Sequence, residues 1–324
     1  MSLDRRSFVR ATSGAALAAV AGTTARSAAQ GLETVRVLTF PSDASKQFLY
    51  PIKAGIFRKL GLDVELTGMS SGEAIIAAVV GGSAEFGGAS LFSVFNAYGR
   101  GIPIRIAAPA AIYDTNNCDA WLVVNKDAPI QAPRDLSGKI MGSDSPTDLY
   151  TVATRVWVTQ NGGDGTSIRS IGLGASEQLF ALQQGRIDFA VFKPPYLTIA
   201  MGSGRVRVLG KPMDVIAPRF LLSCSIATTD YLTREAQTAK TFIQGLTEGA
   251  HYVNRHQAET VDMVAEFTKQ DPNQLRAGVR EVIGEHVTLA DIQKPLDFAF
   301  KYGVIDRQYD ARALLSSVMP MQTG

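Results

Sequence analysis

The pattern of apolar and polar positions predicts short strands that alternate with helices along most of the chain. Residues 62–66, Leu-Asp-Val-Glu-Leu, alternate strictly and predict a strand with one solvated face. Strands that alternate with helices are typical of α/β lobes with mainly parallel sheets. The other predicted strands are 35–39, 139–142 and 187–192, and the predicted helices are 48–59, 147–160, 236–254, 257–269, 272–283 and 289–302.

One unit, a helix closed by glycine and followed by a short strand, occurs twice. The first helix has a predicted capping box of Ser70 and Glu73 and ends at Gly81, and we expect Glu73 to act only as a cap. The second helix ends at Gly185, ahead of the strand 187–192. The copies lie about one hundred residues apart, which is the size of an ordinary domain. The duplication therefore predicts two lobes.

The two predicted lobes are joined by two crossing strands. Residues 33–121 together with 226–324 form the first lobe, and residues 122–225 form the second. The apolar runs 122–124 and 221–227 are the predicted crossings. We expect the mostly helical C-terminal part to pack against the first lobe.

Residues 1–29 resemble a twin-arginine export signal. Arg5 and Arg6 precede residues 11–25, which are uncharged, mildly apolar and too short to anchor the chain in a membrane. Small residues around Ala29 suit a signal peptidase. We therefore predict a periplasmic protein, cleaved near Ala29, with no stable membrane anchor. Export by the general secretory route is the alternative, because the arginine motif departs from its usual pattern.

Composition argues against several classes of function. The net charge is +2 and becomes −1 without residues 1–29, and no long run of Lys or Arg occurs, so we expect no nucleic-acid partner. The three histidines fit no triad or metal motif, and no P-loop sequence is present. We therefore predict a protein that is not an enzyme and that uses no metal and no cofactor.

The two cysteines, Cys118 and Cys224, lie near the predicted crossings. If the crossings pair, the two thiols come close enough for a disulfide, which an exported protein can keep. The alternative is a pair of buried free thiols, since the register is open and a bridge needs Cα atoms within about 7 Å.

Five stretches of the chain resemble the NMT1/THI5-like family of type II periplasmic binding proteins, which handle nitrate, sulfonates, taurine and thiamine-pyrimidine precursors. They keep the order of the family over residues of roughly 33–300, and they are 55–66, 71–72, 85–89, 135–140 and 185–188. The resemblance implies a two-lobed α/β protein that closes on its ligand and delivers it to the permease of an ABC importer.

The expected ligand is a small polar organic molecule, which could be a sulfonate, an aromatic or aliphatic carboxylate, or a pyrimidine-like compound. We expect a monomer. Two alternatives are a thiamine-pyrimidine synthase of the same fold and a ligand-sensing subunit that docks on a receptor. The synthase of the family uses a Cys-rich cluster, which a chain with two cysteines lacks.

Five strand–helix junctions are candidates for the binding site, at residues 40–43, 70–73, 88–90, 144–148 and 192–196. In open α/β sheets the crevice lies beyond the carboxyl ends of the strands, where helix starts offer unpaired N–H groups. Ser145 and Thr147 have helix capping as an alternative role, and Phe40 and Tyr196 have packing. The candidate ligand-binding residues are Phe40, Ser42, Asp43, Ser71, Gly72, Ala89, Ser90, Ser145, Thr147, Lys193, Pro194 and Tyr196.

Lys193 departs from the pattern of the family. Relatives often carry Trp and then an acid before Pro and Tyr, where this chain has Phe192 and Lys193. A cation in the cleft favours an anionic ligand, whereas a lysine that points to solvent is the alternative. Asp43, Asp144 and Asp148 argue against a purely anionic ligand, so the sequence leaves the ligand charge open.

Overall fold

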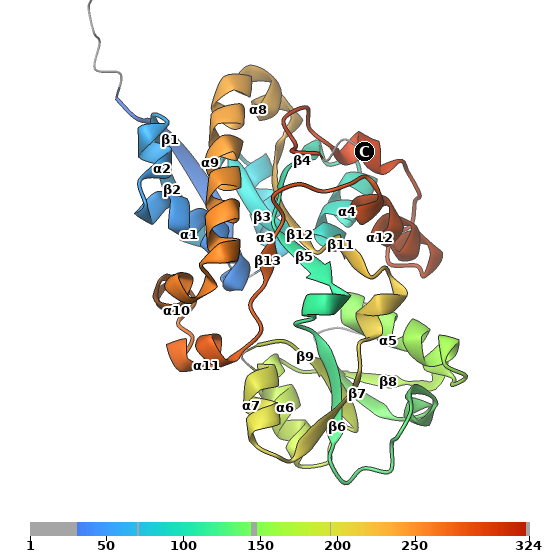
Figure 1. Cartoon of the computed structure of the whole chain (residues 1–324). Coiled ribbons are helices and arrows are strands. Elements are labelled where there is room, and N and C mark those ends of the chain that lie inside the picture. The colour runs from blue at the N-terminus through green and yellow to red at the C-terminus, as the bar shows by residue number, and fades with distance from the viewer. Residues whose placement is uncertain (1–30, 70, 144–147, 195, 322–324) are drawn as a thin grey trace, which may run out of the picture. The chain divides into compact units, whose positions relative to one another are not determined.

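The computed structural model describes residues 31–69, 71–143, 148–194 and 196–321. The predicted signal peptide, residues 1–29, lies outside them. The two lobes are built on two five-stranded sheets, and a small three-stranded sheet contains the connections between them (Figure 1). The predicted α/β class is confirmed.

The first sheet is mainly parallel. Strand β1 pairs in parallel with β2 and β3, and β12 runs antiparallel to β3 and β4. In spatial order the strands are β2 (Leu62–Gly68), β1 (Glu33–Thr39), β3 (Phe86–Ser90), β12 (Ser223–Thr228) and β4 (Ile104–Pro109). The chain therefore returns to the centre of this sheet late in its sequence.

The second sheet repeats this strand order, and it too has one antiparallel strand in the fourth position. Strand β7 pairs in parallel with β8 and β9, and β6 runs antiparallel to β9 and β10. In spatial order the strands are β8 (Arg169–Gly172), β7 (Ile140–Ser143), β9 (Phe189–Phe192), β6 (Trp121–Asn125) and β10 (Val206–Gly210). The duplication seen in the sequence thus extends to whole sheets.

The connection between the lobes differs from the prediction. Residues 122–124 belong to β6 of the second sheet, and most of 221–227 belongs to β12 of the first. The chain passes between the sheets through β5 (Ala111–Asp114) and β11 (Arg219–Leu221), which pair antiparallel, and β13 (Val282–Ile283) pairs with β5. Strands of two to four residues are too short to show a period, which is why the pattern missed them.

The helices surround these sheets. The predicted helix 48–59 is two helices, because Gly55 takes the left-handed conformation at a φ of 69° and separates them. The predicted helix 272–283 ends at Ala277. The bounds are α1 (Lys46–Lys53), α2 (Ile56–Lys59), α3 (Gly72–Val80), α4 (Leu91–Gly99), α5 (Leu149–Gln160), α6 (Ala175–Gln183), α7 (Tyr196–Gly202), α8 (Thr229–Arg234), α9 (Ala236–Arg255), α10 (Val261–Thr268), α11 (Pro272–Ala277) and α12 (Ala290–Lys301).

The start of α3 corrects another expectation. Ser71, not Ser70, is the N-cap of α3, and its hydroxyl accepts from the backbone N–H of Ala74 at 3.2 Å. Ser70 lies outside the described residues. Glu73 accepts instead from the hydroxyl of Ser93 at 2.8 Å, so its carboxylate faces the start of α4 and does not close a capping box.

The C-terminal part packs on the first lobe, as predicted. Helix α9 buries Phe242 against Phe86 of β3, with ring centroids 4.2 Å apart, in a cluster that includes Val35 and Val37 of β1. Stacked aromatic rings and buried aliphatic side chains stabilise this contact by removing apolar surface from water. None of the helices in the described part is both long enough and apolar enough to cross a membrane.

Candidate functional site

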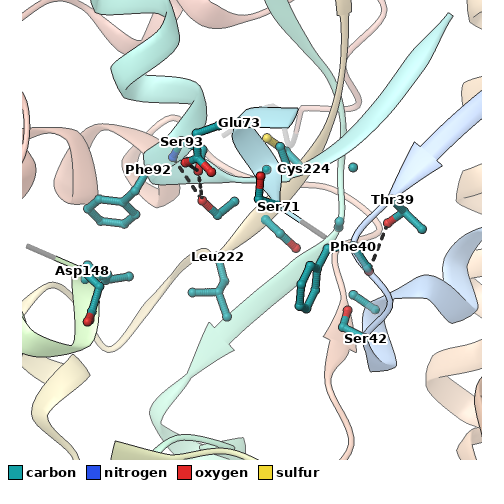
Figure 2. A pocket seen from close by; sticks show the side chains of 18 of the residues that line it. Thr39, Phe40, Ser42, Ser71, Glu73, Phe92, Ser93, Asp148, Leu222 and Cys224 are labelled. Carbon is teal, nitrogen blue, oxygen red and sulfur yellow. Dashed lines mark hydrogen bonds between the residues drawn. The ribbon is translucent and has the colours of Figure 1, made fainter. Parts of the chain in front are cut away.

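A cavity of about 610 Å³ lies where the predicted junctions meet. Each of the five junctions contributes at least one residue to its wall, and Figure 2 shows part of this wall. The candidate residues that line the cavity are Phe40, Ser42, Ser71, Gly72, Ala89, Ser90 and Lys193. Ligand contact by these residues stays a prediction.

The remaining candidates lie elsewhere. Ser145 and Thr147 are outside the described residues. Pro194 lies against Gly278. Tyr196 packs on an apolar cluster of the second lobe that includes Val123 and Leu182. Asp43 lies in an ion-pair network described below. None of these last three is among the described residues that line the cavity.

Hydroxyl groups at two helix starts organise the wall of the first lobe. Ser90 is the N-cap of α4, and its hydroxyl accepts from the N–H of Ser93 at 3.1 Å and donates to the Ser93 hydroxyl at 2.8 Å. Ser93 donates in turn to Glu73, as the dashed lines of Figure 2 show. The chain of bonds fixes the carboxylate of Glu73 at the cavity. The expectation that Glu73 only caps a helix is therefore wrong. Its contact with Ser93, twenty residues further on, could not be predicted from local pattern.

Apolar side chains make up much of the rest of the wall. Phe40 directly follows β1 and is 51% exposed, although it is a large aromatic residue. Exposed aromatic surface in a concave site is typical of small-molecule pockets. The other apolar side chains at the cavity include Phe92, Leu149, Leu222 and Val304. The cavity can therefore hold the apolar body of an organic molecule.

Asp43, Lys46 and Arg280 form a network of ion pairs next to this wall. Lys46 is 0% exposed, and its ammonium donates to a carboxylate oxygen of Asp43 at 2.6 Å and to the carbonyl oxygen of Glu281 at 2.6 Å. Arg280 donates to Asp43 from Nε at 2.8 Å. Burial disfavours the charge on Asp43, but Lys46 and Arg280 outweigh it and lower the pKa of the carboxyl. The geometry gives Asp43 a structural role at the cavity wall.

Lys193 is paired with two carboxylates. Its Nζ lies 2.7 Å from Oε1 of Glu281 and 3.1 Å from Oδ2 of Asp119, and the lysine side chain is 30% exposed. Burial by itself would lower the pKa of Lys193, but the charges of Asp119 and Glu281 raise it well above its ordinary value. Lys193 therefore faces the cleft as a cation whose charge is already balanced. The sequence could not show this, since Glu281 is 88 residues away.

Comparison with known proteins gives the family. The model of NMT1/THI5-like proteins matches residues 45–260. The chain belongs to this family. A search of curated protein sequences finds no match.

Solved structures of low sequence identity share the fold of this NMT1/THI5-like protein. The periplasmic aliphatic sulphonate binding protein SsuA from Escherichia coli is 15% identical, with a TM-score of 0.73 over 90% of this chain and 94% of that one. The alkanesulfonate-binding protein SsuA from Xanthomonas axonopodis pv. citri, bound to MOPS, is 14% identical, with a TM-score of 0.66 over 87% and 98%. A DSZB C27S mutant in complex with biphenyl-2-sulfinic acid is 12% identical, with a TM-score of 0.67 over 88% and 96%.

The cysteines of this NMT1/THI5-like chain are free and buried, so the disulfide considered from the sequence does not form. Cys118 donates from its thiol to the carbonyl oxygen of Ala120 at 3.0 Å, ahead of β6. Cys224 lies in β12 between Ala89 and Pro109 and lines the cavity. Because β6 and β12 belong to different sheets, the pairing of these strands that a disulfide would require does not occur. Burial raises the pKa of both thiols, which makes them weak nucleophiles at neutral pH.

We expect chemical titration to find two thiols in the denatured chain. Without reductant, a thiol reagent such as DTNB should release two equivalents in denaturant and react only slowly with the folded protein, because Cys118 and Cys224 are 5% and 0% exposed. No release from the denatured, unreduced chain would contradict the free-thiol assignment.

Among the described residues, no group of three or more His, Cys, Asp or Glu side chains is arranged to hold a metal ion.

Proposed function

We propose that this chain is the extracytoplasmic substrate-binding protein of an ABC importer and captures a small polar organic solute between its lobes. One observation carries the proposal: a cavity of about 610 Å³ is lined by the strand ends and helix starts of the first lobe together with Asp148, Tyr150 and Lys193 of the second. A ligand that touches both lobes stabilises the closed arrangement through contacts that the open one lacks.

The comparisons support the same function. Two proteins of this fold are named as sulphonate- or alkanesulfonate-binding proteins. By analogy, the relatives suggest a sulfonate, a carboxylate or a pyrimidine-like compound as ligand, and the proposed partner is a permease. Residues 1–29 are the proposed export signal, which would place a monomeric mature protein in the periplasm. The proposed lobes are residues 33–121 with 226–324, and residues 122–225.

The protonated state of the Cys224 thiol favours capture of the solute over a reaction with it. Cys224 lines the cavity, but it is 0% exposed and burial raises the pKa of its thiol. A thiol that stays protonated is a poor nucleophile. We therefore propose that Cys224 does not act as a nucleophile on the solute, which favours capture.

The test is ligand-dependent stability of the purified mature chain. A correct ligand at about one hundred times its Kd should add about 2.7 kcal/mol to the free energy of unfolding, which raises Tm by several degrees. Thermal-shift screening of sulfonates, carboxylates, amines and pyrimidines, with mass spectrometry of small molecules released on denaturation, measures this. Turnover of a screened compound, with no shift from any of them, would overturn the proposal.

A further inference from the structure

The charges at the cavity are mainly negative. Of the described residues that line it, Glu73, Asp148 and Glu281 carry carboxylates and Lys193 carries the one ammonium group. Lys193 already pairs with Glu281 and with Asp119, which is 8% exposed in its side chain. The cavity therefore presents more negative than positive charge to an incoming molecule.

Two buried oxygen acceptors at the cavity lack hydrogen-bond donors. Glu281 is 9% exposed and binds Lys193 through Oε1, whereas its Oε2 has no hydrogen-bond partner among the described residues. Gln47 is 2% exposed, and its Oε1 likewise has no partner in the described part of the chain. Both residues line the cavity. Buried acceptors are nearly always paired, so these two oxygens call for donors, which a bound molecule supplies once the two side chains turn toward the cavity.

An anionic ligand fits this arrangement poorly. A sulfonate or carboxylate supplies acceptors and no donors, so it would leave both oxygens unpaired. It would also compete with Glu281 and Asp119 for the ammonium of Lys193, whose charge these two carboxylates already balance. A cation with N–H groups avoids both costs, because it donates to the unpaired oxygens and balances the excess negative charge.

We propose that the ligand of this chain is an organic nitrogen cation, such as a primary ammonium, amidinium or guanidinium ion, carried on an apolar body. Glu281 and Gln47 accept hydrogen bonds from the cationic head, and the apolar surface of Phe40, Phe92 and Leu222 takes the body. This inference rests on the proposed capture function and reverses the ligand charge suggested by the sulfonate-binding relatives.

The experiment compares ligands that differ only in their head group. 2-Phenylethylamine and n-butylamine are titrated into the mature protein by calorimetry, beside the sulfonate and the alcohol of each carbon skeleton. We expect the amines to bind at least about tenfold more tightly than the matching sulfonates. A single charge-assisted hydrogen bond, which only the amines can donate, changes affinity by about this much.

Two variants and one control test the named acceptors. Glu281→Gln removes a cavity charge with little change of shape, and we expect about tenfold weaker amine binding and stronger sulfonate binding, since Lys193 then keeps fewer carboxylates. Gln47→Met removes the amide and should weaken amine binding without aiding the sulfonate. Glu285→Gln is the matched control, because Glu285 pairs with His251 and Arg255 away from the cavity. It should leave all affinities unchanged.

Each outcome decides the proposal. Preference for amines that is lost in Glu281→Gln or Gln47→Met supports it, and either variant suffices if the other does not fold. Equal or tighter binding of the sulfonates by the wild-type protein overturns the cation assignment and leaves solute capture standing. Failure of every amine to bind contradicts the cation assignment, whereas the wider thermal-shift screen described above decides the proposed function.

Discussion

Replacement of Lys46 by methionine is expected to lower the free energy of unfolding by about 3–5 kcal/mol. Methionine has a similar length but no charge, so Asp43, whose side chain is 13% exposed, loses one of its two cations. The carbonyl oxygen of Glu281 loses the ammonium donor at 2.6 Å as well. Urea denaturation of the mature wild-type and variant proteins measures the difference.

Lys53→Met is the matched control for that experiment. Lys53 lies in the last turn of the same helix, α1, and is exposed. The same change of side chain there should alter stability by less than about 0.5 kcal/mol. If Lys46→Met costs no more than Lys53→Met, the network of Asp43, Lys46 and Arg280 contributes no net stability, and its assigned structural role is wrong.

Lys193→Glu should have the second-largest effect, because it turns an attraction between distant segments into a repulsion. The new carboxylate would stand where Nζ now lies 2.7 Å from Glu281 and 3.1 Å from Asp119. Like charges at such distances cost several kcal/mol. We expect Tm at neutral pH to fall by several degrees.

The pH dependence separates this mechanism from a simple packing defect. Crowded carboxylates bind a proton more readily in the folded protein than in the unfolded chain, so the folded variant gains protons and stability as pH falls. The difference in Tm between Lys193→Glu and wild type should therefore shrink between about pH 8 and pH 5. Lys126→Glu, at an exposed position of the same lobe, is the control. A difference that stays constant with pH would contradict the electrostatic explanation.

Local patterns predicted β1, β2, β7 and β9 but missed β4, β8 and β10. The strict alternation at residues 62–66 reflects burial of one face of a strand. The glycines after α3 and α6 reflect the backbone conformation at the end of a helix. They therefore gave β2 and the repeated helix–strand units. The junctions that line the cavity followed from the same patterns, because the carboxyl ends of parallel strands always meet at one edge of a sheet.

The electrostatics of the site could not be predicted in this way. Lys193, Asp119 and Glu281 come from three distant segments, and only the folded chain brings them together. The sequence identified Lys193 as unusual for its family, but the charge that it presents to a ligand depends on partners that no local pattern reveals. The same holds for Gln47, whose neighbours in α1 mark it only as a helical residue.

The late return of β12 to the first sheet has a consequence for synthesis. The strands of the second sheet, β6 to β10, form one continuous stretch of sequence, whereas β3 and β4 are separated in space by β12. During translation the second lobe can complete its sheet first, while β3 and β4 wait with unpaired edges for residues 223–228. Exposed strand edges pair readily with other chains. The nascent first lobe is therefore the part of this protein whose strand edges stay unpaired longest during synthesis.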